Sequence, residues 1–153
     1  MKKLIGIVTV LCLLYPFIVN ASDTPVGNVK TQKGQASIIR NGTTLEAKTG
    51  SDLFLNDSLK TGADSSISVV FRDDTLVSVG SNSELVINEF HFSPADRKFS
   101  FVARLLKGTS AYVSGIIGKL SPQSVRFETP VANIGIRGTK FAVKLEGDDE
   151  DTR

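Results

Sequence analysis

The sequence predicts an all-β fold: a single domain built as a β-roll or twisted β-solenoid of short strands. Short runs rich in β-branched and aromatic residues predict the strands, and Ser66 to Phe71 (SISVVF) is the clearest of them. Turn signals separate these runs. Asn41-Gly42 is the strongest, because a type I′ hairpin needs positive φ at both central residues. Few segments have the period of a long amphipathic helix.

The strands can be placed in order along the chain. We expect them at residues 29–40, 43–47, 66–71, 76–79, 84–92, 99–106 and 111–113, with two more inside 125–143. Turns are expected at 61–64, 73–74, 80–83 and 93–98, and a wide turn or bend at 115–123, which is rich in glycine and contains a proline. The candidate core residues are Ala36, Ile38, Ile39, Leu85, Ile87, Phe90 and Phe92.

A faint internal repeat favours the solenoid form. The heptapeptide GQASIIR from Gly34 resembles GTSAYVS from Gly108. Two shorter matches follow: VVF ending at Phe71 with VRF ending at Phe127, and LVSVG at 76–80 with VANIG at 131–135. Weak self-similarity of this kind is typical of stacked coils, although any β-rich chain matches itself to some degree.

The first 21 residues have the features of a cleaved signal peptide. A basic start at Met1-Lys2-Lys3 precedes an uncharged apolar run from Leu4 to Val19, and small residues before Ser22 suit cleavage after Ala21. An uncleaved anchor is the alternative, but the run contains Pro16 and is shorter than the about 20 residues that span a bilayer.

Cleavage there would give three parts: a signal peptide at 1–21, a β domain at 22–145, and an acidic flexible tail at 146–153. The mature protein would be periplasmic, without a stable membrane span. Its only cysteine, Cys12, would leave with the signal, so neither lipidation nor disulfides are expected.

The charge of the mature chain argues against a nucleic-acid partner. The whole sequence has 18 Lys and Arg against 16 Asp and Glu, and removing Lys2 and Lys3 leaves 16 of each sign. A protein that binds nucleic acid usually presents a basic stripe.

No arrangement of side chains predicts catalysis, a metal or a cofactor. Asp73 and Asp74 are adjacent, so on a strand they would point to opposite faces, and a turn is the simpler interpretation. His91 is the only histidine, and it lies within a predicted strand. The acidic stretch 148–151 lacks the alternation and the glycine of a calcium loop, although loose divalent binding is a minor alternative. We therefore expect a protein that is not an enzyme.

The stretch around which the chain is organised is its last apolar block, Val125 to Val143. It reads as a strand–turn–strand motif whose glycines mark tight turns or close approaches. Within it, Arg137 is the best single functional candidate. We expect a buried or half-buried arginine that clamps the fold, and a partner contact is the alternative. The residues of the motif are Thr129, Pro130, Ala132, Gly135, Ile136, Arg137, Gly138, Thr139 and Phe141.

This motif resembles the closing signature of the FecR-type periplasmic domain. Upstream matches extend the resemblance over 27–143; they are Gly50-x-x-Leu53, Asp57-x-Leu59-x-Thr61-Gly62, Phe71 to Thr75, and Leu105-Leu106-x-Gly108. Members usually carry glycine where this chain has Asp74, and aspartate tolerates the left-handed conformation better than most residues.

The resemblance implies a twisted β-helical solenoid and a non-catalytic binding or signalling role in the cell envelope. Such domains relay the state of an outer-membrane receptor to a cytoplasmic sigma factor through a transmembrane helix. Only three residues precede the apolar run here, so the sigma-binding and transmembrane parts are expected to be missing. The expected partner is another envelope protein, bound by strand addition at an open edge. The alternative is a structural or cell-wall-associated envelope module.

Overall fold

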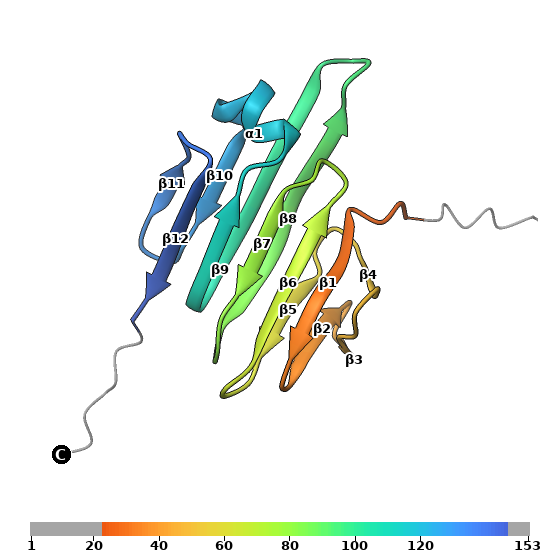
Figure 1. Cartoon of the computed structure of the whole chain (residues 1–153), viewed down its shortest axis with the longest axis vertical. Helices are drawn as coiled ribbons and strands as arrows, with labels where there is room; N and C mark the ends of the chain where they lie inside the picture. Colours follow the sequence, from red (N-terminus) through yellow and green to blue (C-terminus); the bar gives the residue numbers. More distant parts are fainter. Residues whose placement is uncertain (1–22, 147–153) are drawn as a thin grey trace, which may run out of the picture.

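Twelve strands, one short α-helix and one 3-10 turn form the computed structural model, which describes residues 23–146 (Figure 1). This content confirms the all-β prediction. The expected signal peptide and the tail residues 147–153 lie outside the described residues. The elements are β1 (Gly27–Lys33), β2 (Ala36–Arg40), β3 (Thr43–Glu46), β4 (Asp52–Leu53), β5 (Ser58–Thr61), β6 (Ser66–Phe71), β7 (Leu76–Val79), β8 (Glu84–Ser93), β9 (Lys98–Val113), α1 (Ile116–Leu120), η1 (Pro122–Ser124), β10 (Val125–Glu128), β11 (Asn133–Gly135) and β12 (Lys140–Leu145).

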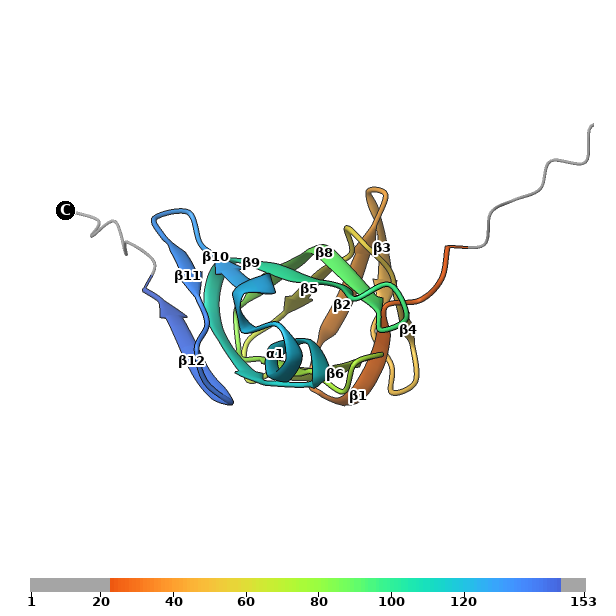
Figure 2. The same ribbon diagram turned by 90° about the horizontal axis from the view of Figure 1, so that it is seen from above.

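The strands form one sheet that curls until two faces pack against each other (Figure 2). One face runs β4-β1-β6-β7-β9-β12, and the other runs β3-β2-β5-β8-β9-β10-β11. The long strand β9 belongs to both. Its first half pairs with β8 and β10, and its second half pairs with β7 and β12. The helix α1 lies across one end of the curl.

The expected β-roll or solenoid is not confirmed. All strand pairs are antiparallel except β9 with β10, whereas a solenoid stacks its coils through parallel pairs. The tight turns are the physical reason. The predicted turn Asn41-Gly42 has φ values of 49° and 78°, which joins β2 and β3 as a hairpin. Chain reversals of this kind place neighbouring strands antiparallel and curl the sheet into a half-barrel.

The internal repeat corresponds to two equivalent corners of the curl. Gly34 and Gly108 adopt left-handed φ values of 69° and 84°, each where the chain passes from one face to the other. A Cβ atom at Gly108 would lie 2.6 Å from the Ser83 Cβ, and one at Gly34 would lie 3.0 Å from the Ser65 Cβ. Both corners therefore need glycine for conformation and for space.

The core between the two faces is aliphatic with a connected group of aromatic rings. Phe71, Phe101 and Phe127 are buried, and the Phe101 ring lies 4.9 Å from that of Phe71 and 6.2 Å from that of Phe127. Most of the predicted core residues are confirmed as buried, namely Ala36, Ile38, Leu85, Ile87 and Phe90. Ile39 and Phe92 are only half-buried.

The segment 115–123 was expected to be a wide turn, but it contains α1 and η1. The buried carboxylate of Asp73 accounts for the helix. Its Oδ2 accepts a hydrogen bond of 3.1 Å from the Ile117 N–H, while the Asp73 carbonyl accepts one of 2.7 Å from the Ile116 N–H. These acceptors satisfy N–H groups that an isolated helix leaves unpaired. No helix within residues 23–146 is long and apolar enough to cross a membrane.

Candidate functional site

The first part of the closing motif is a tight turn between β10 and β11. The Thr129 N–H donates to the Ala132 carbonyl at 2.8 Å, and the Thr129 Oγ1 accepts from the Ala132 N–H at 2.9 Å. Pro130 lies between them at an exposed position where no backbone donor is needed. These bonds fold the chain back, so that β11 pairs antiparallel with β10. Residues 125–143 thus contain three strands instead of the two expected, because β11 forms between β10 and β12, and β12 pairs with β9 instead of with β10.

The second part, residues 136–139, connects β11 to β12 and crosses from one face to the other. Ile136 points inward and is 9% exposed, whereas Arg137, Gly138 and Thr139 are exposed. The Thr139 carbonyl accepts a 2.8 Å hydrogen bond from the Ser114 N–H, which fixes the start of β12 beside the end of β9.

The two glycines of the motif differ. Gly138 has φ 141°, a region that side chains rarely adopt, so its backbone requires glycine. Gly135 has no left-handed φ, and a Cβ there would meet nothing within 4 Å. Nothing in the structure explains glycine at that position.

Phe141 ties β12 to the core. Its ring is half-buried and lies 5.0 Å from the Phe127 ring and 5.2 Å from the Tyr112 ring. With Val143 and Leu145, it forms the inward side of β12, whose residues alternate between half-buried and exposed. The strand is therefore held by one apolar row and leaves its other row to solvent.

Arg137 lies on the surface, which corrects the expectation of a buried or half-buried clamp. Its guanidinium makes no hydrogen bond or ion pair with any residue of 23–146. Arg137 and Arg126 line a shallow groove of about 380 Å³ that also includes Ile136 and Gln123, with no acidic residue among its lining. The groove therefore offers exposed positive charge beside β10 and β11.

β12 is the last strand of its face, and one of its sides has no partner within the described chain. Along β12, every second residue directs its backbone N–H and C=O groups toward β9. The hydrogen bond from the Ser114 N–H to the Thr139 carbonyl shows that these residues are Phe141, Val143 and Leu145. By the same alternation, Lys140, Ala142 and Lys144 direct theirs away from it. β11, the outermost strand of the other face, likewise pairs only with β10.

The structure does not bring together the residues that were considered for catalysis or metal binding. Asp73 is fully buried and acts as a hydrogen-bond acceptor for α1, while Asp74 is exposed with φ 65°. His91 is exposed on β8 opposite Ser100. Within 23–146, no three metal-ligating side chains lie close enough to hold an ion.

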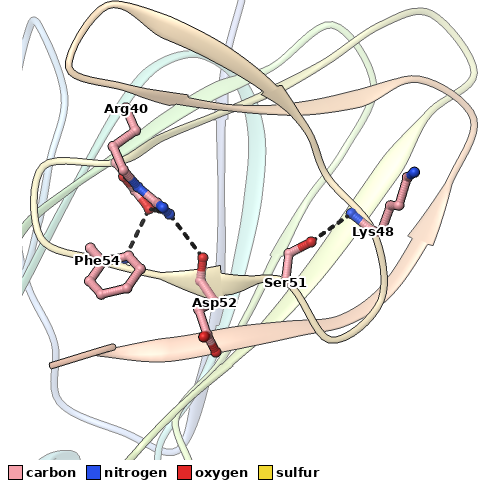
Figure 3. Close-up of polar contacts among 6 residues, drawn as sticks. Arg40, Lys48, Ser51, Asp52 and Phe54 are labelled. Atoms are coloured by element: carbon pink, nitrogen blue, oxygen red, sulfur yellow. Dashed lines mark hydrogen bonds and ion pairs between the residues drawn. The ribbon is translucent and has the colours of Figure 1, made fainter. Parts of the chain in front are cut away.

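Sequence reasoning missed a second cluster, at the other side of the molecule. The buried carboxylate of Asp57 accepts from the Arg40 Nε and Nη2, both at 2.8 Å, and from the Phe54 N–H at 2.9 Å. Figure 3 shows the Arg40 guanidinium reaching the Asp52 carbonyl, with the Phe54 ring beside it. One feature of the sequence indicated this cluster, since Asp57 is an acidic residue within the upstream family pattern.

Comparison with known proteins adds one finding. A family model described as FecR protein matches residues 57–153, which contain the closing motif and most of the strands. No curated protein and no solved structure matches the chain.

Proposed function

The chain belongs to the FecR protein family, and from that membership we propose a non-catalytic protein-binding module that serves signalling in the cell envelope. The family points to a regulatory role. The finer assignment, binding of an envelope partner by strand addition, rests on the geometry of the closing motif.

The observation that carries the proposal is the free edge of β12. Three of its residues, Lys140, Ala142 and Lys144, present backbone donors and acceptors that the described chain leaves unpaired. An extended segment of a partner would add to this edge as a further strand, with main-chain hydrogen bonds supplying affinity. Lysines on an edge also discourage indiscriminate pairing, so the edge is selective.

The chemistry of the surface defines the partner segment. The exposed side chains on β12 include two lysines, and Arg126 and Arg137 lie in the groove beside η1. Lys144 is paired with Glu146 at 3.1 Å, but both side chains are largely exposed, so this pair is weak. A strand with acidic residues at alternate positions would complement these cations.

Backbone recognition is tested by Ala142→Pro, with Ala142→Val as the matched control. Proline removes the outward N–H without removing a bond to β9, whereas valine keeps the N–H. A photo-crosslinking residue at position 144 should capture an envelope protein in intact cells. The purified captured protein should bind the control at wild-type affinity and bind the proline variant at least about tenfold more weakly.

Arg137→Ala gives an independent readout. Because Arg137 is exposed and unpaired among residues 23–146, its loss should leave the denaturant midpoint unchanged and reduce partner affinity. A crosslinker at Lys60, an exposed residue of β5, should not capture the same protein. Equal capture at positions 60 and 144, or wild-type binding by the proline variant, would refute strand addition. Capture of cell-wall material instead would favour a structural envelope module.

Export is tested separately. The mature N-terminus should be Ser22 in the periplasmic fraction, as expected from the apolar run ending in Val-Asn-Ala. Intact mass measures this directly, and retention of residues 1–21 on membrane-extracted protein would contradict it.

A further inference from the structure

A second cleft, of about 790 Å³, lies on the side of the molecule away from the closing motif. Its wall includes Arg40 at the end of β2, Arg72 after β6, and Phe54 and Leu55 after β4, and Phe90 of β8 also lines it. Segments distant in sequence thus bring two guanidinium groups and an apolar surface to one place. Figure 2 shows β1 to β4 opposite β10 to β12.

Arg40 is held rigidly at this cleft. Its Nε and Nη2 bind the two carboxylate oxygens of Asp57, Nη2 also donates to the Asp52 carbonyl at 3.0 Å, and the guanidinium lies 4.3 Å from the centre of the Phe54 ring (Figure 3). The hydrogen bond to Asp57 raises the pKa of Arg40, so its charge is constant. Within the described chain Nη1 has no partner, and its two N–H groups remain available.

Arg72 is the cation of the cleft that has no ion-pair partner within residues 23–146. Its side chain is exposed, and its guanidinium lies 5.6 Å from the centre of the Phe90 ring. It makes no hydrogen bond or ion pair with residues 23–146, whereas its backbone N–H is fixed to the Val26 carbonyl at 3.0 Å. The backbone anchor and the ring restrict where this cation can lie.

The charges and the apolar lining together define a ligand. Asp57 compensates Arg40, and Asp23, which also lines the cleft, moderates the positive potential, so a singly charged anion fits better than a dianion. Leu55 is 45% exposed beside these groups and offers an apolar contact. A planar guanidinium fork matches a carboxylate.

We propose that this cleft binds a carboxylate carried next to an apolar side chain, as at the C-terminus of a peptide ending in leucine. The guanidinium of Arg72 and the free N–H groups of Arg40 would bind the carboxylate, and Leu55 would pack against the side chain. The site does not depend on the β12 edge and can be tested without the envelope partner.

The probe is N-acetylleucine, added to the ¹⁵N-labelled full-length protein and followed by amide chemical shifts. Saturable shifts should appear at Leu55, Arg72 and their neighbours. N-acetylleucine amide, which lacks the charge, should bind at least about tenfold more weakly. Acetyl-Ala-Ala-Ala-Leu separates the sources of the carboxylate. It should bind at least as tightly as N-acetylleucine if a peptide terminus is the ligand, whereas weaker binding would overturn the peptide assignment.

Variants complete the test. Arg72→Ala should weaken N-acetylleucine binding by about tenfold or more, and Leu55→Ser should weaken it severalfold. The matched control is Lys107→Ala, which removes an exposed cation of β9 outside both proposed binding surfaces and should bind as wild type does. Equal affinities for acid and amide, tighter binding of inorganic phosphate, or an unchanged dissociation constant in Arg72→Ala would each overturn the proposal.

Discussion

The Ser83 hydroxyl accepts a 2.9 Å hydrogen bond from the backbone N–H of Thr109, the residue that follows the corner glycine of β9. The same hydroxyl donates to the Ser81 carbonyl at 2.9 Å. Ser65 repeats both bonds at the other corner, with the Gln35 N–H and the Ala63 carbonyl, each at 2.8 Å. Two buried serines thus hold the two places where the chain changes face.

Replacing Ser83 with alanine should lower the free energy of unfolding by about 1–3 kcal/mol, because it leaves the Thr109 N–H and the Ser81 carbonyl without this partner. Ser65→Ala should cost a similar amount. Urea midpoints measure both, with Ser93→Ala as the control, since Ser93 bonds only to exposed Asp96. A wild-type midpoint in Ser83→Ala would show that water replaces the hydroxyl.

Substitutions of the neighbouring residues Asp73 and Asp74 should change the free energy of unfolding in opposite directions. Asp73→Ala removes the acceptor of the Thr75 N–H, the Thr75 hydroxyl and the Ile117 N–H, at a cost on the order of 3 kcal/mol. Asp74→Gly should be neutral or stabilising by up to about 1 kcal/mol, since glycine adopts φ 65° freely. Guanidinium denaturation of the two variants checks this. Equal effects would contradict the assigned roles.

Gly138 and Gly135 form a matched pair within the closing motif. Gly138→Ala should cost roughly 1–3 kcal/mol through backbone strain alone, because no atom lies near the added methyl group. Gly135→Ala should be close to neutral, since it meets neither strain nor contact. Thermal melts of both variants give the comparison. A neutral Gly138→Ala would mean that residues 136–139 adapt their backbone.

Tyr112→Phe should stabilise the protein by up to about 1 kcal/mol, because the buried Tyr112 hydroxyl has no hydrogen-bond partner within residues 23–146. Burial raises the pKa of Tyr112, and the Ser114 and Thr75 hydroxyls, which lie near the phenol without meeting hydrogen-bond geometry, only partly oppose that rise. The unfolded chain therefore loses this proton first as pH rises.

The stability contributed by the neutral phenol is present below about pH 10 and is lost as pH rises through the folded-state pKa. Urea midpoints between about pH 8 and pH 11 should fall more steeply for wild type than for Tyr112→Phe. Parallel curves would contradict the assignment.

The strands and turns were predicted well, because their conformations depend mainly on the local sequence. Residues 66–71 and the Asn41-Gly42 turn are examples. The sequence indicated less clearly which strands pair in parallel and which pair antiparallel. A repeat such as GQASIIR and GTSAYVS identified equivalent corners, but equivalent corners occur in a curled antiparallel sheet as well as in stacked coils.

The helix α1 and the cleft near Arg72 could not be predicted because both depend on contacts between distant segments. Asp73 and Ile117 are 44 positions apart, and no local pattern links them. The exposure of Arg137 was also mispredicted. Its glycine neighbours indicated a tight crossing of the backbone but not the direction of the side chain.

The sharing of β9 between both faces has a consequence for how the chain folds. Residues 27–93 can form their hairpins as they become available, but β7 and β8 each keep an unpaired edge until residues 98–113 arrive. Such edges are prone to pair with other chains. The pairing of β1 with β6 is also long-range, and non-local pairing slows folding. The interval before β9 docks is therefore the aggregation-sensitive step of folding. Protection of the Leu76 and Ser78 N–H groups, which face β9, from hydrogen exchange should appear only with that of β9.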